Sequence, residues 1–150
     1  MLEALLRNID ACPTSAHVVQ RASEIIIENG FDHVSLESPF TSGNLQHGYV
    51  ARGGTIIAWK NAQTLSTDGI RIVGAHTDSP GLHIKTKPDT QTLNWQQLQV
   101  EVYGGPLLNS WLDRDLAIAG HVVLREGTTS LFSSVHPVPV QPVQHVLHFH

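Results

Sequence analysis

Residues 70–80 contain the side chains of this chain whose types and spacing best suit chemistry. An apolar run of strand type is followed by His76, one spacer residue and Asp78. An imidazole binds a divalent ion through one ring nitrogen, while a nearby carboxylate accepts the proton on the other nitrogen and makes the ligand more basic. The spacing therefore predicts His76 as a metal ligand and Asp78 as the catalytic-site carboxylate that orients it.

A second interpretation of the same residues needs no metal. A histidine and an aspartate separated by one residue form a short motif that also occurs without function. Residues 77–81 are a threonine, an aspartate, a serine, a proline and a glycine, which are turn-forming types. In this interpretation Asp78 caps the backbone of a turn at a strand end, and the surrounding sequence must decide between the two.

The elements around the motif can be predicted from local patterns. Apolar spacing predicts a helix that starts at residue 2 and ends before Pro13, and a second helix from Thr14 or Ser15 to a stop at residues 29–30. Two glycines, residues 53–54, separate β-prone runs and predict a hairpin. Further strands are expected at residues 34–36, 70–75, 82–87, 98–103 and 116–124.

The strand at residues 70–75 is the one that would position the motif. Its nearly continuous apolar character is typical of a strand covered on both faces. His76 would then lie at the carboxyl edge of a sheet, where ligand sites of open α/β sheets collect.

Composition excludes several classes of protein. At 150 residues, with 41% apolar and 15% charged residues, the chain can form one ordinary globular core. The net charge is −4 and the nine basic residues are scattered, so neither nucleic acid nor an acidic membrane surface is an expected partner. No apolar run is long enough to span a membrane. The chain has a single cysteine, Cys12, so an internal disulfide is impossible and a cytoplasmic location is expected. Cys12 itself is expected to pack as a small hydrophobe.

Two longer blocks place the motif in a wider context. Residues 76–88 read HTDSPGLHIKTKP and residues 100–123 read VEVYGGPLLNSWLDRDLAIAGHVV. Together with residues 9–17 and the glycine hairpin near Arg52, these blocks resemble the M18 family of zinc aminopeptidases, the aspartyl aminopeptidases. The resemblance covers roughly the first 130 residues.

The resemblance implies a fold and a domain organisation. The fold would be α/β, a mixed sheet flanked by helices in the three-layer α/β/α arrangement of zinc exopeptidases. Residues 1–103 would be the amino-terminal part of the catalytic domain. Residues 104–150 would begin an inserted β-rich domain used in oligomer assembly, and the chain would be truncated relative to the family.

The resemblance also implies an activity. His76 would supply one zinc ligand and Asp78 would orient it, while the other ligands of a two-zinc centre come later in the family and are not found in residues 81–150. The complete protein would be a homo-oligomer that removes an amino-terminal residue, Asp or Glu, from peptide substrates. The alternative is a catalytically inactive truncated fragment that acts at most as a weak metal-binding or subunit-association module.

Other polar groups carry weaker interpretations. Residues 113–115, Asp-Arg-Asp, could form a metal site or an ion pair, and the ion pair is favoured because carboxylates pair readily with the arginine fork. The tail from Ser133 has three prolines and four histidines and is expected to be a frayed terminus rather than a metal site. The remaining isolated histidines are expected to be surface or packing residues; they are His17, His33, His47, His83 and His121.

Overall fold

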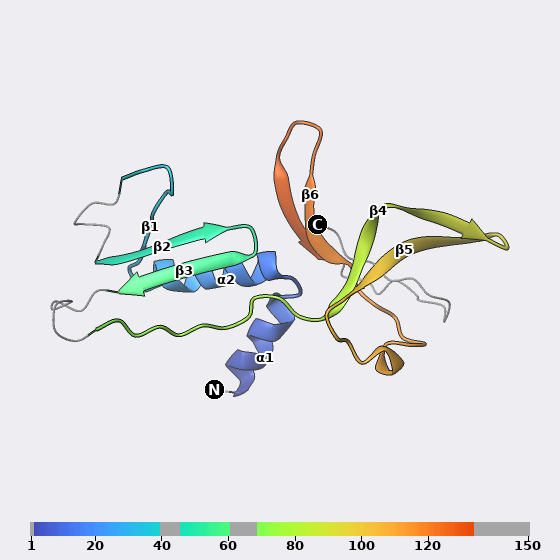
Figure 1. Cartoon of the computed structure of the whole chain (residues 1–150), viewed down its shortest axis with the longest axis horizontal. Helices are drawn as coiled ribbons and strands as arrows, with labels where there is room; N and C mark the ends of the chain where they lie inside the picture. The colour runs from blue at the N-terminus through green and yellow to red at the C-terminus, as the bar shows by residue number, and fades with distance from the viewer. Residues whose placement is uncertain (1, 40–45, 61–68, 134–150) are drawn as a thin grey trace. The chain divides into compact units, whose positions relative to one another are not determined.

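The computed structural model describes residues 2–39, 46–60 and 69–133. The chain forms two compact units, Met1–Asp78 and Ser79–His150. Helices lie in the first unit, and the second is built mainly from strands, so the predicted mixed α/β class is confirmed (Figure 1). The three-layer arrangement and the functional boundary between residues 103 and 104 stay predictions.

The two helices of the first unit lie where the sequence predicted them. Helix α1 is Leu2–Ala11 and ends before Pro13, and helix α2 is Ser15–Glu28. The Thr14 side chain caps α2 by accepting a hydrogen bond from the His17 amide. The helix ends at Asn29, and Gly30 follows with φ of +82°, a conformation that glycine adopts without steric cost.

The first unit contains a three-stranded sheet in the order β1-β2-β3. Strand β1 (Asp32–His33) pairs in parallel with β2 (His47–Arg52), which pairs antiparallel with β3 (Thr55–Lys60). The predicted glycine hairpin is confirmed, and Gly53 has a φ of +55°. The short strand predicted at residues 34–36 was misplaced, because a turn closed by the Ser38 amide on the Ser35 carbonyl ends the extended segment there.

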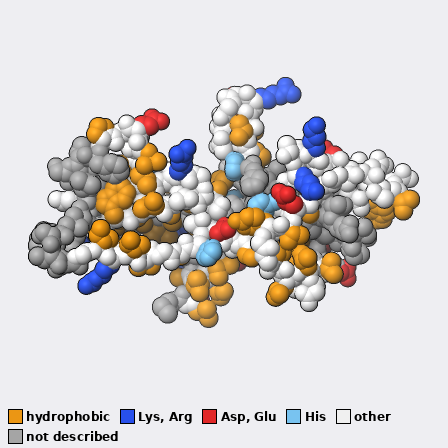
Figure 2. Space-filling view, in the orientation of Figure 1, with side chains coloured by type: hydrophobic (Ala, Val, Ile, Leu, Met, Phe, Trp, Pro, Cys, Tyr) orange, Lys and Arg blue, Asp and Glu red, His pale blue; other side chains and the backbone are white. Residues whose placement is uncertain are grey.

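The core of the first unit lies between α2 and the sheet. Helix α2 packs against β2 and β3, as Figure 1 shows. The buried hydrophobic side chains are Val19 from the helix together with Val34 and Tyr49 from the strand region. Helix α1 buries none of its residues, so its apolar stripe contributes to the hydrophobic surface visible in Figure 2. None of the helices in the described part of the chain has the length and apolar character needed to cross a bilayer.

The second unit contains two antiparallel hairpins and the short 3₁₀ helix η1 (Leu108–Ser110). Strand β4 (Gly81–Thr92) pairs with β5 (Trp95–Tyr103), and β6 (Ala119–Val123) pairs with β7 (Thr129–Ser133). The strands predicted at residues 82–87 and 98–103 are therefore confirmed within longer strands. The strand predicted at residues 116–124 is also present but is shorter than expected.

The first hairpin of this unit is irregular in its middle and at its turn. The register jumps from Ile84 opposite Val100 to Asp89 opposite Leu98. Pro88 lies in the unpaired stretch, and a proline has no amide to donate to a ladder, so a bulge there is expected. Two non-glycine residues, Leu93 and Asn94, form the turn with φ of 49° and 66°.

The strand predicted at residues 70–75 is wrong for this chain. Residues 69–76 belong to no strand, and Ile72 and Val73 are 87% and 97% exposed. An interior strand needs ladder partners on its edges and cover on its faces. No strand in the described part of the chain pairs with this segment, so the apolar pattern lacks the neighbours that would fold it into a sheet.

The Thr14 cap gives a direct test of the helix that supports the first unit. Replacing Thr14 with Ala removes the acceptor for the His17 amide and is expected to lower the free energy of unfolding by about 1 kcal/mol. Urea unfolding followed by far-UV circular dichroism measures the change. Thr14→Ser keeps the hydroxyl and should lose less, and an equal loss in both variants would contradict a role for the cap.

Candidate functional site

His76 and Asp78 lie together at the carboxyl end of the first unit. The Nδ1 atom of His76 is 3.3 Å from Oδ1 of Asp78, which is long for a hydrogen bond. The His76 side chain is 91% exposed and the Asp78 side chain 44% exposed. The contact occupies one ring nitrogen and leaves Nε2 of a solvent-facing imidazole as the nitrogen that can take a ligand.

The residue between them points the other way. Thr77 is half-buried, while both of its neighbours are exposed. Its hydroxyl donates a hydrogen bond of 2.6 Å to the carbonyl oxygen of Gly54 in the β2–β3 turn. The motif is therefore attached to the folded part of its own unit through its middle residue.

The donor set fits one ligand of a zinc site. Zinc takes imidazole nitrogen, and a ligating histidine commonly donates its second ring N–H to a carboxylate. In the described ranges, no group of three or more His, Cys, Asp or Glu side chains is placed to hold a metal ion. His76 can thus contribute one bond to a metal. The remaining ligands of a zinc site must come from outside the described residues.

The ion pair predicted within residues 113–115 is wrong. Arg114 donates instead to the Ser110 carbonyl oxygen at 3.3 Å, and within the described segments no ion pair joins it to Asp113 or Asp115. Asp113 has a φ of 54°, so it is part of a tight turn after η1. Adjacent residues do not face each other in such a turn, and the arginine therefore binds the end of η1.

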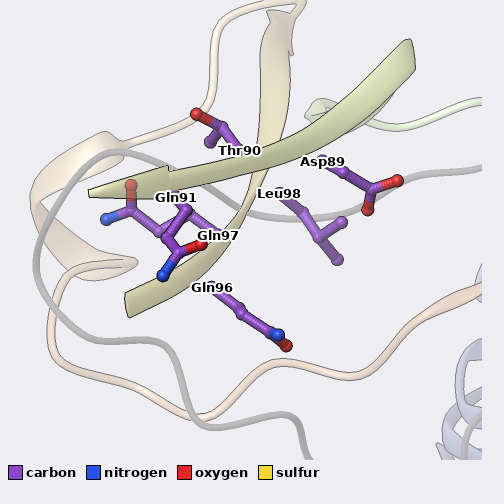
Figure 3. Close-up of a pocket in the computed structure, with 6 residues that line it drawn as sticks. All are labelled: Asp89, Thr90, Gln91, Gln96, Gln97 and Leu98. Carbon is purple, nitrogen blue, oxygen red and sulfur yellow. The ribbon is translucent and has the colours of Figure 1, made fainter. Parts of the chain in front are cut away.

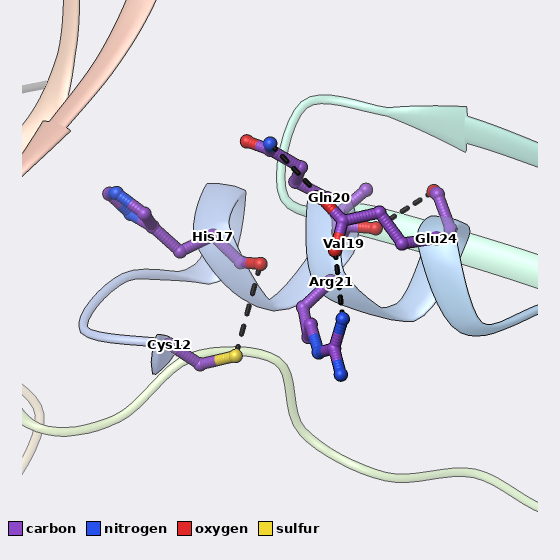
Figure 4. A network of polar contacts seen from close by, with 7 residues as sticks. Cys12, His17, Val19, Gln20, Arg21 and Glu24 are labelled. Atoms are coloured by element: carbon purple, nitrogen blue, oxygen red, sulfur yellow. Dashed lines mark hydrogen bonds and ion pairs between the residues drawn. The ribbon is translucent and has the colours of Figure 1, made fainter. Parts of the chain in front are cut away.

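His17 and Cys12 belong to the start of α2 and serve its local structure. Cys12 Sγ is 3.9 Å from the His17 carbonyl oxygen (Figure 4). The Thr14 hydroxyl oxygen is 2.7 Å from His17 Nδ1. Burial lowers the pKa of His17 below its ordinary value of 6.5, because the charged ring loses solvation. Cys12 is half-buried, in agreement with the predicted role of a small hydrophobe.

Three other histidines of the described ranges, His33, His47 and His83, have aromatic neighbours. His83 stacks on Tyr103 with ring centroids 4.4 Å apart and an angle of 13° between the ring planes. His33 lies against Tyr49, and His47 meets Phe31 edge to face. These contacts agree with the predicted packing role. The histidines of the tail lie outside the described residues.

A polar hollow lies on the β4–β5 hairpin of the second unit (Figure 3). Its volume is about 630 Å³, and it is lined by three cross-strand pairs of side chains. The lining residues are Asp89, Thr90, Gln91, Gln96, Gln97 and Leu98. These residues include one carboxylate and neither a histidine nor a cysteine.

The sequence did not indicate the contact that holds the motif. In the sequence, Thr77 is only the spacer of the motif and Gly54 is only a turn residue. The two are 23 positions apart, and no local pattern brings them together.

Comparison with known proteins gives a consistent family. The family model described as aminopeptidase I zinc metalloprotease (M18) matches residues 8–148. A probable M18 family aminopeptidase 2 of Streptomyces coelicolor is 44% identical over 137 residues, covering 89% of this chain and 31% of the relative. The chain thus spans about a third of the length of the curated relatives it matches.

Solved structures agree with the sequence comparisons. An M18 family aminopeptidase from Thermotoga maritima matches with a TM-score of 0.74 and 26% identity, over 87% of this chain and 29% of that chain. The dodecamer of yeast aminopeptidase 1 matches with the same score and identity, over 94% of this chain and 34% of that chain. The fold of the described segments is therefore found within larger enzymes.

The lowered pKa of His17 predicts how stability depends on pH. The unfolded chain protonates this ring near pH 6.5, and the folded chain does so at a lower pH. Between these values the unfolded state binds more protons, so the free energy of unfolding should fall as the pH falls below about 6.5. Urea unfolding at several pH values should show a shallower pH dependence for His17→Gln. Parallel curves for the two proteins would contradict the assignment.

Proposed function

The chain belongs to the M18 family of zinc aminopeptidases, and on that premise we propose that it supplies His76 as one metal ligand of a two-zinc aminopeptidase centre. M18 homologues are peptidases, and zinc is the metal in the family's description. The observation that carries the proposal is the contact between His76 Nδ1 and Asp78 Oδ1 at 3.3 Å. It leaves the outward-facing ring nitrogen of a highly exposed imidazole for the metal.

The two side chains have distinct tasks in this proposal. His76 binds zinc through Nε2, and Asp78 accepts the Nδ1 proton, which fixes the tautomer and raises the basicity of the ligating nitrogen. Zinc, when bound, polarises a peptide carbonyl and lowers the pKa of a water molecule. Because the His76 side chain is exposed, ligands from outside the described residues can complete a zinc site around it.

The proposed substrate is a peptide whose amino-terminal residue is Asp or Glu. This preference and the second zinc ion rest on the resemblance of residues 76–88 and 100–123 to the aspartyl aminopeptidases. Assembly of the complete protein into a homo-oligomer is supported by the yeast relative, which forms a dodecamer. A three-layer α/β/α arrangement and a cytoplasmic location also belong to this proposal.

A second candidate function is that of an inactive module that binds zinc weakly or associates with another subunit. It is favoured by the absence, within the described ranges, of any cluster of three metal-binding side chains. A catalytic zinc ordinarily has about three protein ligands. The two candidates are compatible, because family membership describes the complete enzyme and the module describes this chain by itself.

Zinc binding at His76 tests the first candidate. A zinc titration of the chain, followed through the ring resonances of His76 in NMR spectra, should show saturable shifts at that ring. Asp78→Asn keeps the shape of the side chain but weakens the acceptor, and it should lower the affinity about 10–100-fold. His33→Ala, which alters an exposed histidine outside the motif, should leave the affinity at His76 unchanged. Unmoved His76 resonances in the unaltered chain would contradict the ligand role.

Activity of the purified chain tests the second candidate. The 150-residue protein should show no zinc-dependent hydrolysis of peptides that begin with Asp or Glu, because one ligand does not hold a catalytic zinc. In a complete enzyme that carries the same motif, the change equivalent to His76→Ala should remove nearly all activity. Robust zinc-dependent turnover by the isolated chain would rule out the inactive module.

A further inference from the structure

The hydroxyl of Thr77 makes a hydrogen bond that joins distant parts of the first unit. It donates to the Gly54 carbonyl oxygen at 2.6 Å, across 23 positions in the sequence. Thr77 is half-buried in a segment whose preceding residues, from position 69 to His76, are all exposed. The bond therefore fixes one point of a chain segment that has no strand ladder to hold it.

The acceptor of this bond is itself held in place. Gly54 lies in the β2–β3 turn, against the first turn of α2. A Cβ added at Gly54 would lie 2.7 Å from Ser15 Oγ, closer than real Cβ atoms approach, and 3.0 Å from Ser15 Cβ, which is a tight contact. The turn thus lies close against the helix, and this contact helps to position the carbonyl that receives the Thr77 hydroxyl.

We infer that Thr77 is a positioning residue for the metal ligand His76. The chain bends at Thr77, whose side chain is half-buried while those of His76 and Asp78 on either side are exposed. Holding Thr77 inward on Gly54 therefore directs His76 and Asp78 outward on the same side, where their side chains meet at 3.3 Å. The inference rests on the proposed function, in which His76 binds zinc through the ring nitrogen that Asp78 leaves open.

The expected effect of the bond is modest and local. A neutral hydrogen bond contributes about 1 kcal/mol, which corresponds to about fivefold in an equilibrium constant. Losing it should loosen the backbone between the two side chains and lower the population in which Asp78 accepts the Nδ1 proton. The affinity of His76 for zinc should fall about fivefold with it.

A pair of substitutions at position 77 tests the inference. Thr77→Val keeps the branched shape but has no hydroxyl, and Thr77→Ser keeps the hydroxyl but lacks the methyl group. Long-range ¹H–¹⁵N NMR of the 150-residue chain without metal measures the tautomer of the His76 ring, and a titration with zinc alone measures the affinity at that ring. Thr77→Val should reduce the Nδ1–H population and weaken zinc binding about fivefold, while Thr77→Ser should stay close to the unaltered chain.

Two further measurements keep the test decisive. Urea unfolding of each variant shows whether the fold persists. If Thr77→Val does not fold, Gly54→Ala moves the acceptor away and should reproduce the loss, and adding Ser15→Gly should restore it by making room for the new methyl group.

Each failure has its own signature. A Thr77→Val variant with an unchanged tautomer, or a Thr77→Ser variant as weak as Thr77→Val, would overturn the positioning role. The tautomer is measured without zinc, so that result does not depend on metal binding. Zinc that leaves the His76 ring of the unaltered chain unmoved would overturn the ligand role and, with it, the inference that Thr77 serves a metal ligand.

Discussion

The contact between Gly54 and Ser15 is the constraint on which the ordered part of the first unit depends. It brings the β2–β3 turn so close to the start of α2 that a Cβ at position 54 would require Ser15 to shift. The sheet and the helix are thereby set relative to each other around Val19 and Tyr49. The carbonyl oxygen of the same glycine receives Thr77, so one close approach both packs the core and anchors the motif.

Elements with complete local signals could be predicted from the sequence. The cap at Thr14, the stop at Gly30 and the hairpin at Gly53 each depend on residues within a few positions of one another, and each is present. The strands at residues 82–87 and 98–103 could also be predicted, although their pairing into one hairpin and its bulge at Pro88 could not. The strand predicted at residues 70–75 is absent for a different reason. Its apolar pattern requires paired neighbouring strands and cover on both faces, and the described part of the chain provides neither.

The candidate site also has one part that could be predicted from the sequence and one part that could not. The pair of His76 and Asp78 was recognisable because its chemistry depends on a spacing of two residues, and the two side chains do meet. The contribution of Thr77 was not recognisable, because it depends on a tertiary contact over 23 positions. The ion pair expected around Arg114 failed because the backbone turn at Asp113, which no pattern indicated, changed the direction of the side chains.

The extended segment before His76 has a consequence for the lifetime of the protein. Its backbone groups from position 69 to 76 belong to no ladder, and its apolar side chains face solvent. A protease needs an extended, unpaired stretch of about this length in its cleft, so cleavage can occur here without global unfolding. One cut in this stretch would leave His76 and Asp78 on a different fragment from the β2–β3 hairpin. The hydrogen bond from Thr77 to Gly54 would then be a non-covalent link between the two fragments.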